Sequence, residues 1–218
     1  MLPQPNRQMA LAQYRLRARF YDTELAAFEP VRRRAIDSLQ LKRGETVLDV
    51  GCGTGLSFER MRQGVGPRGH IVGIEQSPEM AELARRRVAQ HNWHNVTLVN
   101  APVATADIAC QSDAALFHFT HDILRQRDGI RHVVRHLKPG ARVVAAGLQW
   151  SAPWDWLTNG LVLMAAMYST TSLEGLAQPW SHLAQHLQEV QPVSSSINGV
   201  YIICGKVLSK GSEVAHHV

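Results

Sequence analysis

The chain has 218 residues, of which 45% are hydrophobic and 19% charged, and its formal net charge at pH 7 is +5. This length and apolar content suffice for a buried core and exclude a chain that is disordered along most of its length. Three widely spaced cysteines exclude a disulfide scaffold and favour a reducing compartment. The first residues lack the apolar core of a signal peptide, and no apolar run approaches the roughly 20 residues that span a bilayer. We therefore expect a cytoplasmic protein without stable membrane insertion.

The first 150 residues alternate between strand patterns and helix patterns. Strands are predicted at residues 45–50, 70–75, 96–100, 113–119 and 141–148, and helices at 24–39, 56–63, 78–91 and 123–137. Pro30 lies within the first helical pattern, so we expect a kink there or a helix that begins near this residue. Strictly alternating strands and helices are typical of a parallel sheet with helices on both faces.

The last third of the chain has a different pattern. Helices are predicted at residues 154–168 and 179–187, and two β-rich runs follow at 190–196 and 200–208. Asn198-Gly199 lies between these runs, and Asn-Gly between strands is a strong hairpin signal. We expect an α/β, Rossmann-like fold, in which a seven-stranded, mostly parallel sheet ends in an antiparallel C-terminal hairpin. A single domain is predicted, with N-terminal cap helices in 1–40, a cofactor-binding core in 41–150, and substrate-side helices and the hairpin in 151–218.

The first predicted strand runs directly into a glycine cluster, residues 51–55 (GCGTG), which opens a helix. Such a loop lets the backbone turn sharply and approach a ligand, and the helix N-terminus offers free N–H groups. Glu75 ends the next strand, where a carboxylate accepts two hydrogen bonds from a ribose diol. Asp49 precedes the loop and would repel a pyrophosphate, whereas it suits a ligand with a cationic amino group. The pattern therefore argues against NAD or FAD.

The segment VLDVGCGTG (residues 47–55), together with IVGIEQS (71–77), resembles the class I, seven-strand S-adenosylmethionine-dependent methyltransferases. The resemblance extends from residue 47 to about residue 148, and the C-terminal hairpin fits the sixth and seventh strands of that family. It implies S-adenosyl-L-methionine as cofactor and methyl transfer as the activity. The overall plan resembles the small phosphatidylethanolamine- and quinone-type enzymes, and also a bacterial lysine methyltransferase that modifies elongation factor Tu.

The resemblance also implies a cofactor site. The glycines would line the methionine and ribose portions, Asp49 would lie near the amino group, and Glu75 would hold the ribose hydroxyls. Asn100 stands where family members usually carry an acidic residue that faces the adenine. Tyr14 or Tyr21 would close over the cofactor, unless this segment is a packing helix with a basic outer face. The full predicted set is Tyr21, Asp49, Gly51, Cys52, Gly53, Gly55, Glu75, Gln76, Met80, Asn100, Ala101 and Phe117.

The segment after the fourth predicted strand contains the candidate catalytic residue. His118 and His121 lie where the family has its reaction centre, and a neutral imidazole with an ordinary pKa near 6.5 can accept a proton. We predict His121 as the catalytic residue; the alternative is that it packs or caps the next helix. Indole faces attract ammonium groups, so one of three tryptophans is expected near the substrate, unless they cover the core: Trp150, Trp154 and Trp156.

No metal site is predicted. His132 and His136 are spaced four apart on a predicted helix, but no cysteine or carboxylate completes a set of ligands. The tetrapeptide Asn/Asp-Pro-Pro-Tyr/Phe of many base-methylating enzymes is absent after the fourth strand, so a nucleic acid is not the expected partner.

The expected acceptor is an amine nitrogen, with a protein lysine as the first choice, carried by an acidic protein such as a translation elongation factor. The basic net charge suits such a partner. A lipid head-group amine or a quinone-type small molecule is the alternative acceptor. A protein that binds S-adenosylmethionine without catalysis is the alternative of another class.

Overall fold

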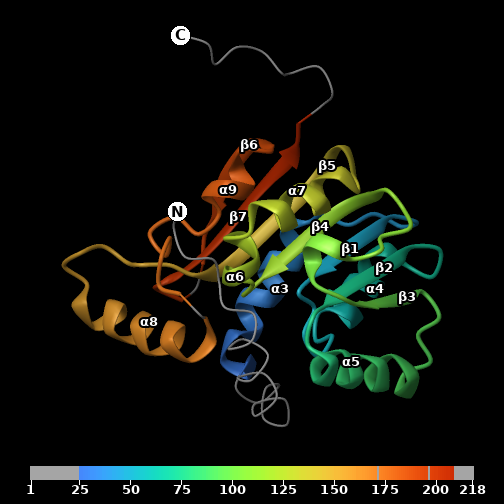
Figure 1. The fold of residues 1–218 in the computed structure, drawn as a ribbon, viewed down its shortest axis with the longest axis horizontal. Helices are drawn as coiled ribbons and strands as arrows, with labels where there is room; N and C mark the ends of the chain where they lie inside the picture. The colour runs from blue at the N-terminus through green and yellow to red at the C-terminus, as the bar shows by residue number, and fades with distance from the viewer. Residues whose placement is uncertain (1–24, 171, 196, 209–218) are drawn as a thin grey trace.

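The computed structural model describes residues 25–170, 172–195 and 197–208, which contain a seven-stranded sheet of order β3-β2-β1-β4-β5-β7-β6 (Figure 1). Its strands β1 to β5 pair in parallel, and β7 runs antiparallel to both of its neighbours. The predicted mixed sheet with an antiparallel C-terminal hairpin is therefore confirmed. The strands are β1 (Thr46–Val50), β2 (His70–Glu75), β3 (Val96–Asn100), β4 (Ser112–His118), β5 (Leu137–Leu148), β6 (Leu187–Val193) and β7 (Val200–Val207).

Helices cover both faces of the sheet, and each face has its own hydrophobic core cluster. One face packs against α3 (Glu29–Ser38), α4 (Phe58–Val65), α5 (Pro78–Gln90) and α8 (Trp156–Ser169). The other packs against η2 (Val103–Thr105), α6 (His121–Leu124), α7 (Arg127–Arg135) and α9 (Ser181–Ala184). A short helix η1 (Leu25–Phe28) precedes α3. The central strands are buried on both faces, as their continuous apolar runs require.

Three predicted helices differ from the structure. Pro30 lies in the first turn of α3, so that helix begins there and is not kinked, since proline lacks only an N–H that has no helical partner at this position. The predicted helix 123–137 is divided into α6 and α7. The predicted helix 179–187 is reduced to the four residues of α9, because Leu187 already pairs with Val207 in the hairpin.

Arg32, the first residue of the arginine run 32–34, is buried. It forms an ion pair with Glu29 on the side of α3 that packs over β4 and β5. Arg33 and Arg34 are exposed. The run is therefore not uniform, because a helix that lies on a sheet buries at least one residue in every turn.

Among the residues that the structure describes, no helix is both long and apolar enough to cross a membrane.

Candidate functional site

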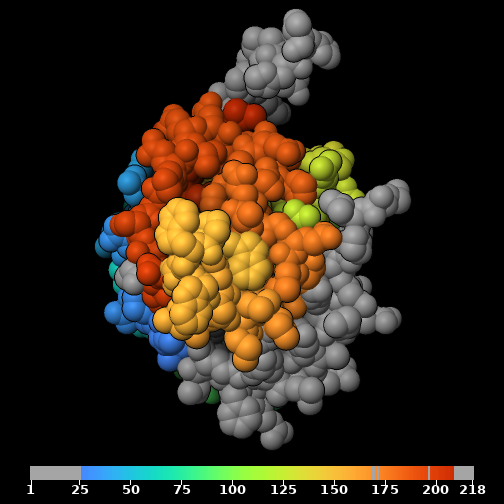
Figure 2. Space-filling view, turned by 90° about the vertical axis from the view of Figure 1, so that its left-hand side faces the viewer, coloured from blue at the N-terminus to red at the C-terminus, as the bar shows by residue number. Residues whose placement is uncertain are grey.

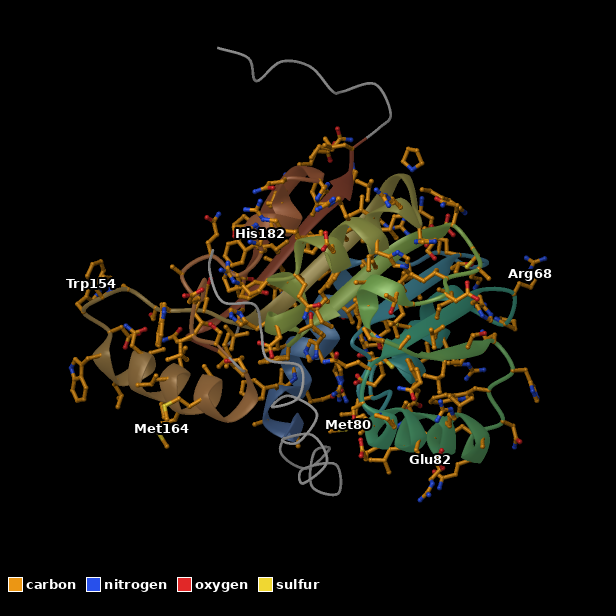
Figure 3. All side chains as sticks on the ribbon, viewed as in Figure 1. Arg68, Met80, Glu82, Trp154, Met164 and His182 are labelled. Carbon is orange, nitrogen blue, oxygen red and sulfur yellow. The ribbon has the colours of Figure 1, made fainter. Side chains whose placement is uncertain are left out.

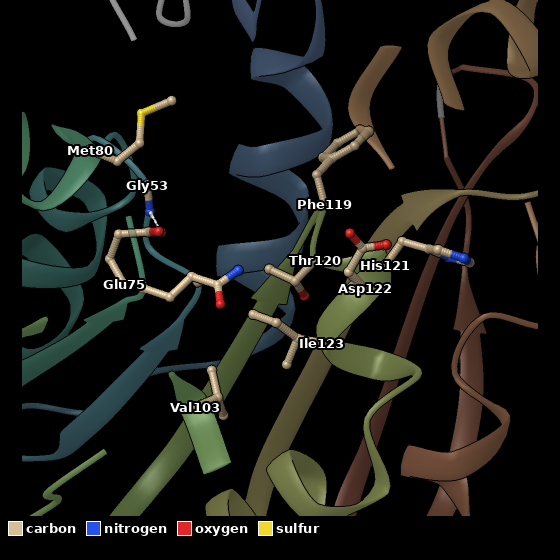
Figure 4. A pocket seen from close by; sticks show the side chains of 11 residues that line it. Gly53, Glu75, Met80, Val103, Phe119, Thr120, His121, Asp122 and Ile123 are labelled. Carbon is tan, nitrogen blue, oxygen red and sulfur yellow. Dashed lines mark hydrogen bonds between the residues drawn. The ribbon is translucent and has the colours of Figure 1, made fainter. Parts of the chain in front are cut away.

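A pocket opens at the carboxyl ends of β1, β2 and β4, where ligands bind in open parallel sheets (Figure 4). It brings together the glycine loop, the end of β2, the start of α5, and the segment between β4 and α6. The residues that line it are Gly51, Gly53, Glu75, Gln76, Met80, Val103, Phe119, Thr120, His121, Asp122 and Ile123.

The glycine loop is held against β2 by its own backbone. The N–H groups of Gly51 and Cys52 both donate to the carbonyl of Ile74, at 2.8 and 3.0 Å. The φ of Gly51 is +75°, and a Cβ built there would lie 2.6 Å from Cγ2 of Thr120. Glycine is therefore required at this position by conformation and by space, and the loop leaves a cradle that any side chain would fill.

Glu75 joins the loop to α5. One oxygen of its buried carboxylate accepts from the Gly53 N–H at 3.0 Å, and the other accepts from the Ser77 N–H at 2.7 Å (Figure 4). Burial raises the pKa of Glu75, and the backbone donors offset part of that rise. Each carboxylate oxygen has a second lone pair, so the group keeps acceptor capacity for a diol while the backbone fixes its position.

Asp49 lies beneath the loop in the middle of β1 and is only 2% exposed. Its Oδ2 has no hydrogen-bond partner. Burial raises the pKa of this carboxyl to about 7; Arg32 opposes the rise and Glu75 adds to it. A buried carboxylate oxygen without a donor costs free energy that a cationic ligand would recover. The residue does not line the pocket directly, so its predicted proximity to the amino group remains a prediction.

His121 lies on the far side of the pocket. Its Nε2 donates to the carbonyl of Glu174 at 3.0 Å; a carbonyl can only accept, so Nδ1 carries the lone pair. Nδ1 is buried without a partner, and burial lowers the pKa of the ring, which is therefore neutral at pH 7. Figure 4 shows the ring directed away from Glu75.

A second hollow begins at His121, beyond the end of β5. It is mostly apolar and adjoins the first pocket through Phe119 and His121. We call it the acceptor hollow; its lining is Phe119, His121, Gly147, Leu148, Thr170 and Tyr201.

Phe119 borders both hollows and was not among the predicted cofactor-binding or catalytic residues. Its φ is +54°, a region that aromatic residues rarely adopt, and its N–H donates to the Ala146 carbonyl at 2.7 Å. Phe117, which the sequence assigned to the cofactor, is instead fully buried in the core cluster beneath α6 and α7. That assignment is corrected, because side chains alternate along β4 and the turn at Phe119 brings the following residues to the pocket. Val103, Thr120 and Ile123 were also missed.

The other predicted site residues are divided between the pocket and its support. Gln76 and Met80 line the pocket, whereas Asn100 uses its amide to donate to the Glu75 carbonyl at 2.8 Å. Cys52 is buried under the loop, and burial raises the pKa of its thiol. Gly55 has a φ of +77° and packs on Phe58, while Ala101 packs against the core. Tyr14 and Tyr21 lie outside the described residues.

The remaining candidates are not in the pocket. His118 is half-buried beside Phe119, and desolvation of its ring lowers its pKa to about 3, so it is neutral. Trp150 packs against the core, whereas Trp154 and Trp156 are 83% and 78% exposed. His132 and His136 stack on each other and bond to backbone carbonyls. Within the described parts of the chain, no cluster of three or more metal-ligating side chains is found.

Residues 47–140 match a family model described as a methyltransferase domain. That segment makes up less than half of the chain. Over 116 residues, 51% of this chain, the domain is 33% identical to the arsenite methyltransferase of Halobacterium salinarum, covering 29% of that protein. Over 114 residues it is 28% identical to the demethylmenaquinone methyltransferase of Listeria monocytogenes, covering 48% of it. The chain thus spans less than half of the length of these curated relatives.

Solved structures share the fold. An O-methyltransferase family protein from Burkholderia thailandensis gives a TM-score of 0.69 at 17% identity, covering 88% of this chain and 59% of that one. The N-methyltransferase NodS of Bradyrhizobium japonicum, in complex with S-adenosyl-L-homocysteine, gives 0.60 at 17% identity, covering 84% and 90%. At these identities the solved structures show that the fold is shared.

The described residues fit the predicted cofactor, S-adenosyl-L-methionine. The glycine cradle leaves room for a ligand that a Cβ would exclude, and Glu75 retains acceptor capacity for two ribose hydroxyls. The orphaned Asp49 oxygen suits a cationic amino group, and Met80 offers an apolar side chain for the adenine. All four features lie at one end of the sheet.

Proposed function

We propose that this chain transfers a methyl group from S-adenosylmethionine to an amine nitrogen that enters the acceptor hollow. One observation carries the choice of site and reaction: the neutral His121 ring has a buried Nδ1 lone pair without a partner at the wall of an apolar hollow. An acceptor that loses a proton during methylation needs such a base, and a solvent-exposed surface histidine would be protonated over a wider pH range.

When bound, the cofactor supplies an activated methyl on a sulfonium, so the protein mainly provides alignment and exclusion of water. The loop and Glu75 hold the nucleoside end, and Phe119 bounds both the cofactor pocket and the acceptor hollow. With the cofactor held there, the hollow would align the lone pair of the acceptor nitrogen with the methyl group that the cofactor supplies. The proton of the nitrogen then passes to Nδ1 of His121.

The amine must be neutral before it reacts. An alkyl amine with an ordinary pKa near 10.4 costs about 4–5 kcal/mol to deprotonate at pH 7. The apolar side chains of Phe119 and Leu148 lower this cost, because burial disfavours the ammonium form. The hollow therefore selects the reactive form of an amine before His121 accepts any proton.

The amine is carried either by a protein or by a small or lipid molecule, and these two classes of acceptor differ in size. A protein lysine, as on an acidic translation factor, is the carrier that the sequence favours. A small or lipid-borne acceptor is supported by the narrow apolar hollow, and the arsenite and demethylmenaquinone enzymes cited above are named for non-protein acceptors. We favour the small or lipid-borne acceptor, with the lysine as the second candidate.

The test is product analysis with a radiolabelled methyl group. The full chain is incubated with labelled cofactor and a bacterial lysate, and label is counted in protein, lipid and small-molecule fractions. Label in the lipid or small-molecule fraction supports the favoured acceptor, and label in a single protein band supports the lysine. Intact cofactor binding with no label in any fraction contradicts the proposal and indicates a non-catalytic binding protein.

A further inference from the structure

Helix α8 has an apolar outer surface that the rest of the described chain does not cover. Nine large hydrophobic side chains are exposed in the described residues, and all but one lie between residues 154 and 173. In Figure 1 the helix projects from the end of the sheet, and Figure 3 shows Trp154, on the loop before the helix, and Met164, on the helix, pointing outward. Figure 2 looks onto this face. We call the following residues the α8 surface: Trp154, Trp156, Leu157, Leu161, Leu163, Met164 and Met167.

The exposure is not explained by packing within the fold. Among the α8 side chains that the structure describes, only Val162 and Ala166 are buried; both pack on the core cluster, and Val162 also lies against Gly199 at the hairpin. An apolar helix of about 14 residues is ordinarily a buried core helix or an interfacial segment. Because α8 buries only this narrow stripe, the first explanation does not hold for it. A contiguous apolar patch of this kind marks an interaction site.

The chemistry of the α8 surface is unusually uniform. Residues 156–173 contain no charged side chain and no histidine. The carboxylate of Asp155, at the N-terminal end of the helix, accepts hydrogen bonds from Ser151 Oγ at 2.9 Å and from the Thr158 N–H at 3.2 Å. Glu174, at the other end, lies 3.8 Å from Arg125. The patch therefore presents no unpaired carboxylate, and the chain that carries it has a net charge of +5.

The polar side chain of Asn159, on α8, is bonded to the chain's own backbone. Asn159 accepts from the Ser151 N–H at 2.8 Å and donates to the Ala152 carbonyl at 3.0 Å. A protein–protein interface carries about one hydrogen bond per 100–200 Å², and the Asn159 amide is already engaged within the chain. Exposed tryptophans beside leucine and methionine instead match the composition of surfaces that lie in the boundary between lipid head groups and acyl chains.

We infer that the α8 surface docks on an anionic lipid bilayer. A helix of this length extends for roughly 21 Å, less than the roughly 30 Å hydrocarbon core, so it would lie along the membrane surface with its indoles at the head groups. The net positive charge of the chain complements anionic head groups, which attract basic proteins over about one Debye length.

The docked helix would adjoin the acceptor hollow. Thr170, directly after α8, lines the hollow, and the Glu174 carbonyl accepts the His121 hydrogen bond. A bilayer against α8 would therefore deliver acceptors to the wall of the hollow that carries His121. This part of the inference rests on the proposed function, and it specifies that the acceptor is borne by a lipid, as a head-group amine or another membrane-soluble nucleophile.

The test is sedimentation of the full chain with vesicles of phosphatidylethanolamine and phosphatidylglycerol, followed by its tryptophan fluorescence. The wild type is expected to pellet with the vesicles and to show a blue shift. The double variant Trp154→Ser, Trp156→Ser should bind at least about tenfold more weakly, since two indoles are removed from lipid contact. A second variant, Leu161→Ser with Met164→Ser, should lose binding similarly. Val190→Ser, an exposed apolar residue on β6, is the matched control and should bind as the wild type does.

Three results would overturn the inference. They are a wild type that stays in the supernatant, variants that bind as well as the wild type, and a wild-type dimer that the tryptophan variants convert to monomers. Cofactor affinity is measured by calorimetry on each variant and should not change, because none of these residues lines the cofactor pocket. If the wild type does not bind the cofactor, the proposed function is contradicted, whereas the result on membrane docking still holds.

Discussion

The β1–β3 half of the molecule and the β5–β7 half differ in the kind of side chain that each buries and exposes. In the first half, polar groups are buried and bonded to backbone: Glu75 is held by the Gly53 and Ser77 N–H groups, and Ser77 caps α5. In the second half, apolar groups are exposed along α8 while the hollow beside it is apolar. The two halves therefore differ: the first holds buried polar groups at the pocket, and the second leaves apolar groups exposed beside the acceptor hollow.

Removal of the His121 imidazole should have the largest effect. That effect should fall on the rate of methyl transfer and not on the binding of the cofactor. His121→Ala is expected to lower kcat by about 10²–10⁴-fold, the usual contribution of a general base, with cofactor affinity nearly unchanged. Because burial lowers the pKa of His121, protonation of this ring should reduce the wild-type rate only below its ordinary pKa of 6.5. Steady-state rates and calorimetry check this. His91→Ala, at an exposed position after α5, is the control.

Glu75→Gln should weaken cofactor binding by about 100-fold, because charge-assisted hydrogen bonds to the ribose and the loop are replaced by weaker ones. The expected effect is on affinity and not on the chemical step, the reverse of His121. Calorimetric titration measures it. Glu82→Gln, a carboxylate on α5 that pairs with exposed arginines, should bind the cofactor normally. Equal affinity in the Glu75 variant would remove that residue from the site.

Gly51→Ala should lower the free energy of unfolding by about 2–4 kcal/mol, from backbone strain plus the clash with Thr120 and Ile123. Gly44 also has a positive φ, but a Cβ there meets nothing within 4 Å. Gly44→Ala should therefore cost only about 1–2 kcal/mol, the strain alone. Urea denaturation of both variants separates strain from steric exclusion, and equal costs would show that the cradle is not tightly packed.

Asp49 should give the smallest effect, a change in the pH dependence of stability. Its folded pKa of about 7 lies above the ordinary value of 3.8, so the folded state binds the proton more tightly. Its contribution to stability is complete below about pH 4 and is lost as the pH rises through about 7. Between pH 5 and pH 8 the wild type should lose about 1–3 kcal/mol that Asp49→Asn retains. Identical pH profiles of the two proteins would contradict the burial of a charged group.

The cofactor half of the site was predictable because its signals are local. A glycine cluster after a buried strand and an acidic residue at the next strand end are separated by about one strand–helix unit, and parallel strands place both at one edge. The bounds of β2 and β3 agree with the prediction for the same reason, since their apolar runs are short and bounded.

The acceptor side was not predictable in the same way, because its chemistry depends on contacts between distant segments. The tautomer of His121 is set by the carbonyl of Glu174. Phe119 lines the pocket because its φ is positive, a conformation that an aromatic residue gives no reason to expect. The residues of α8 have an apolar pattern that suits a core helix equally well. Burial is a property of how elements pack, so only the assembled fold shows that Trp154 and Trp156 are left at the surface.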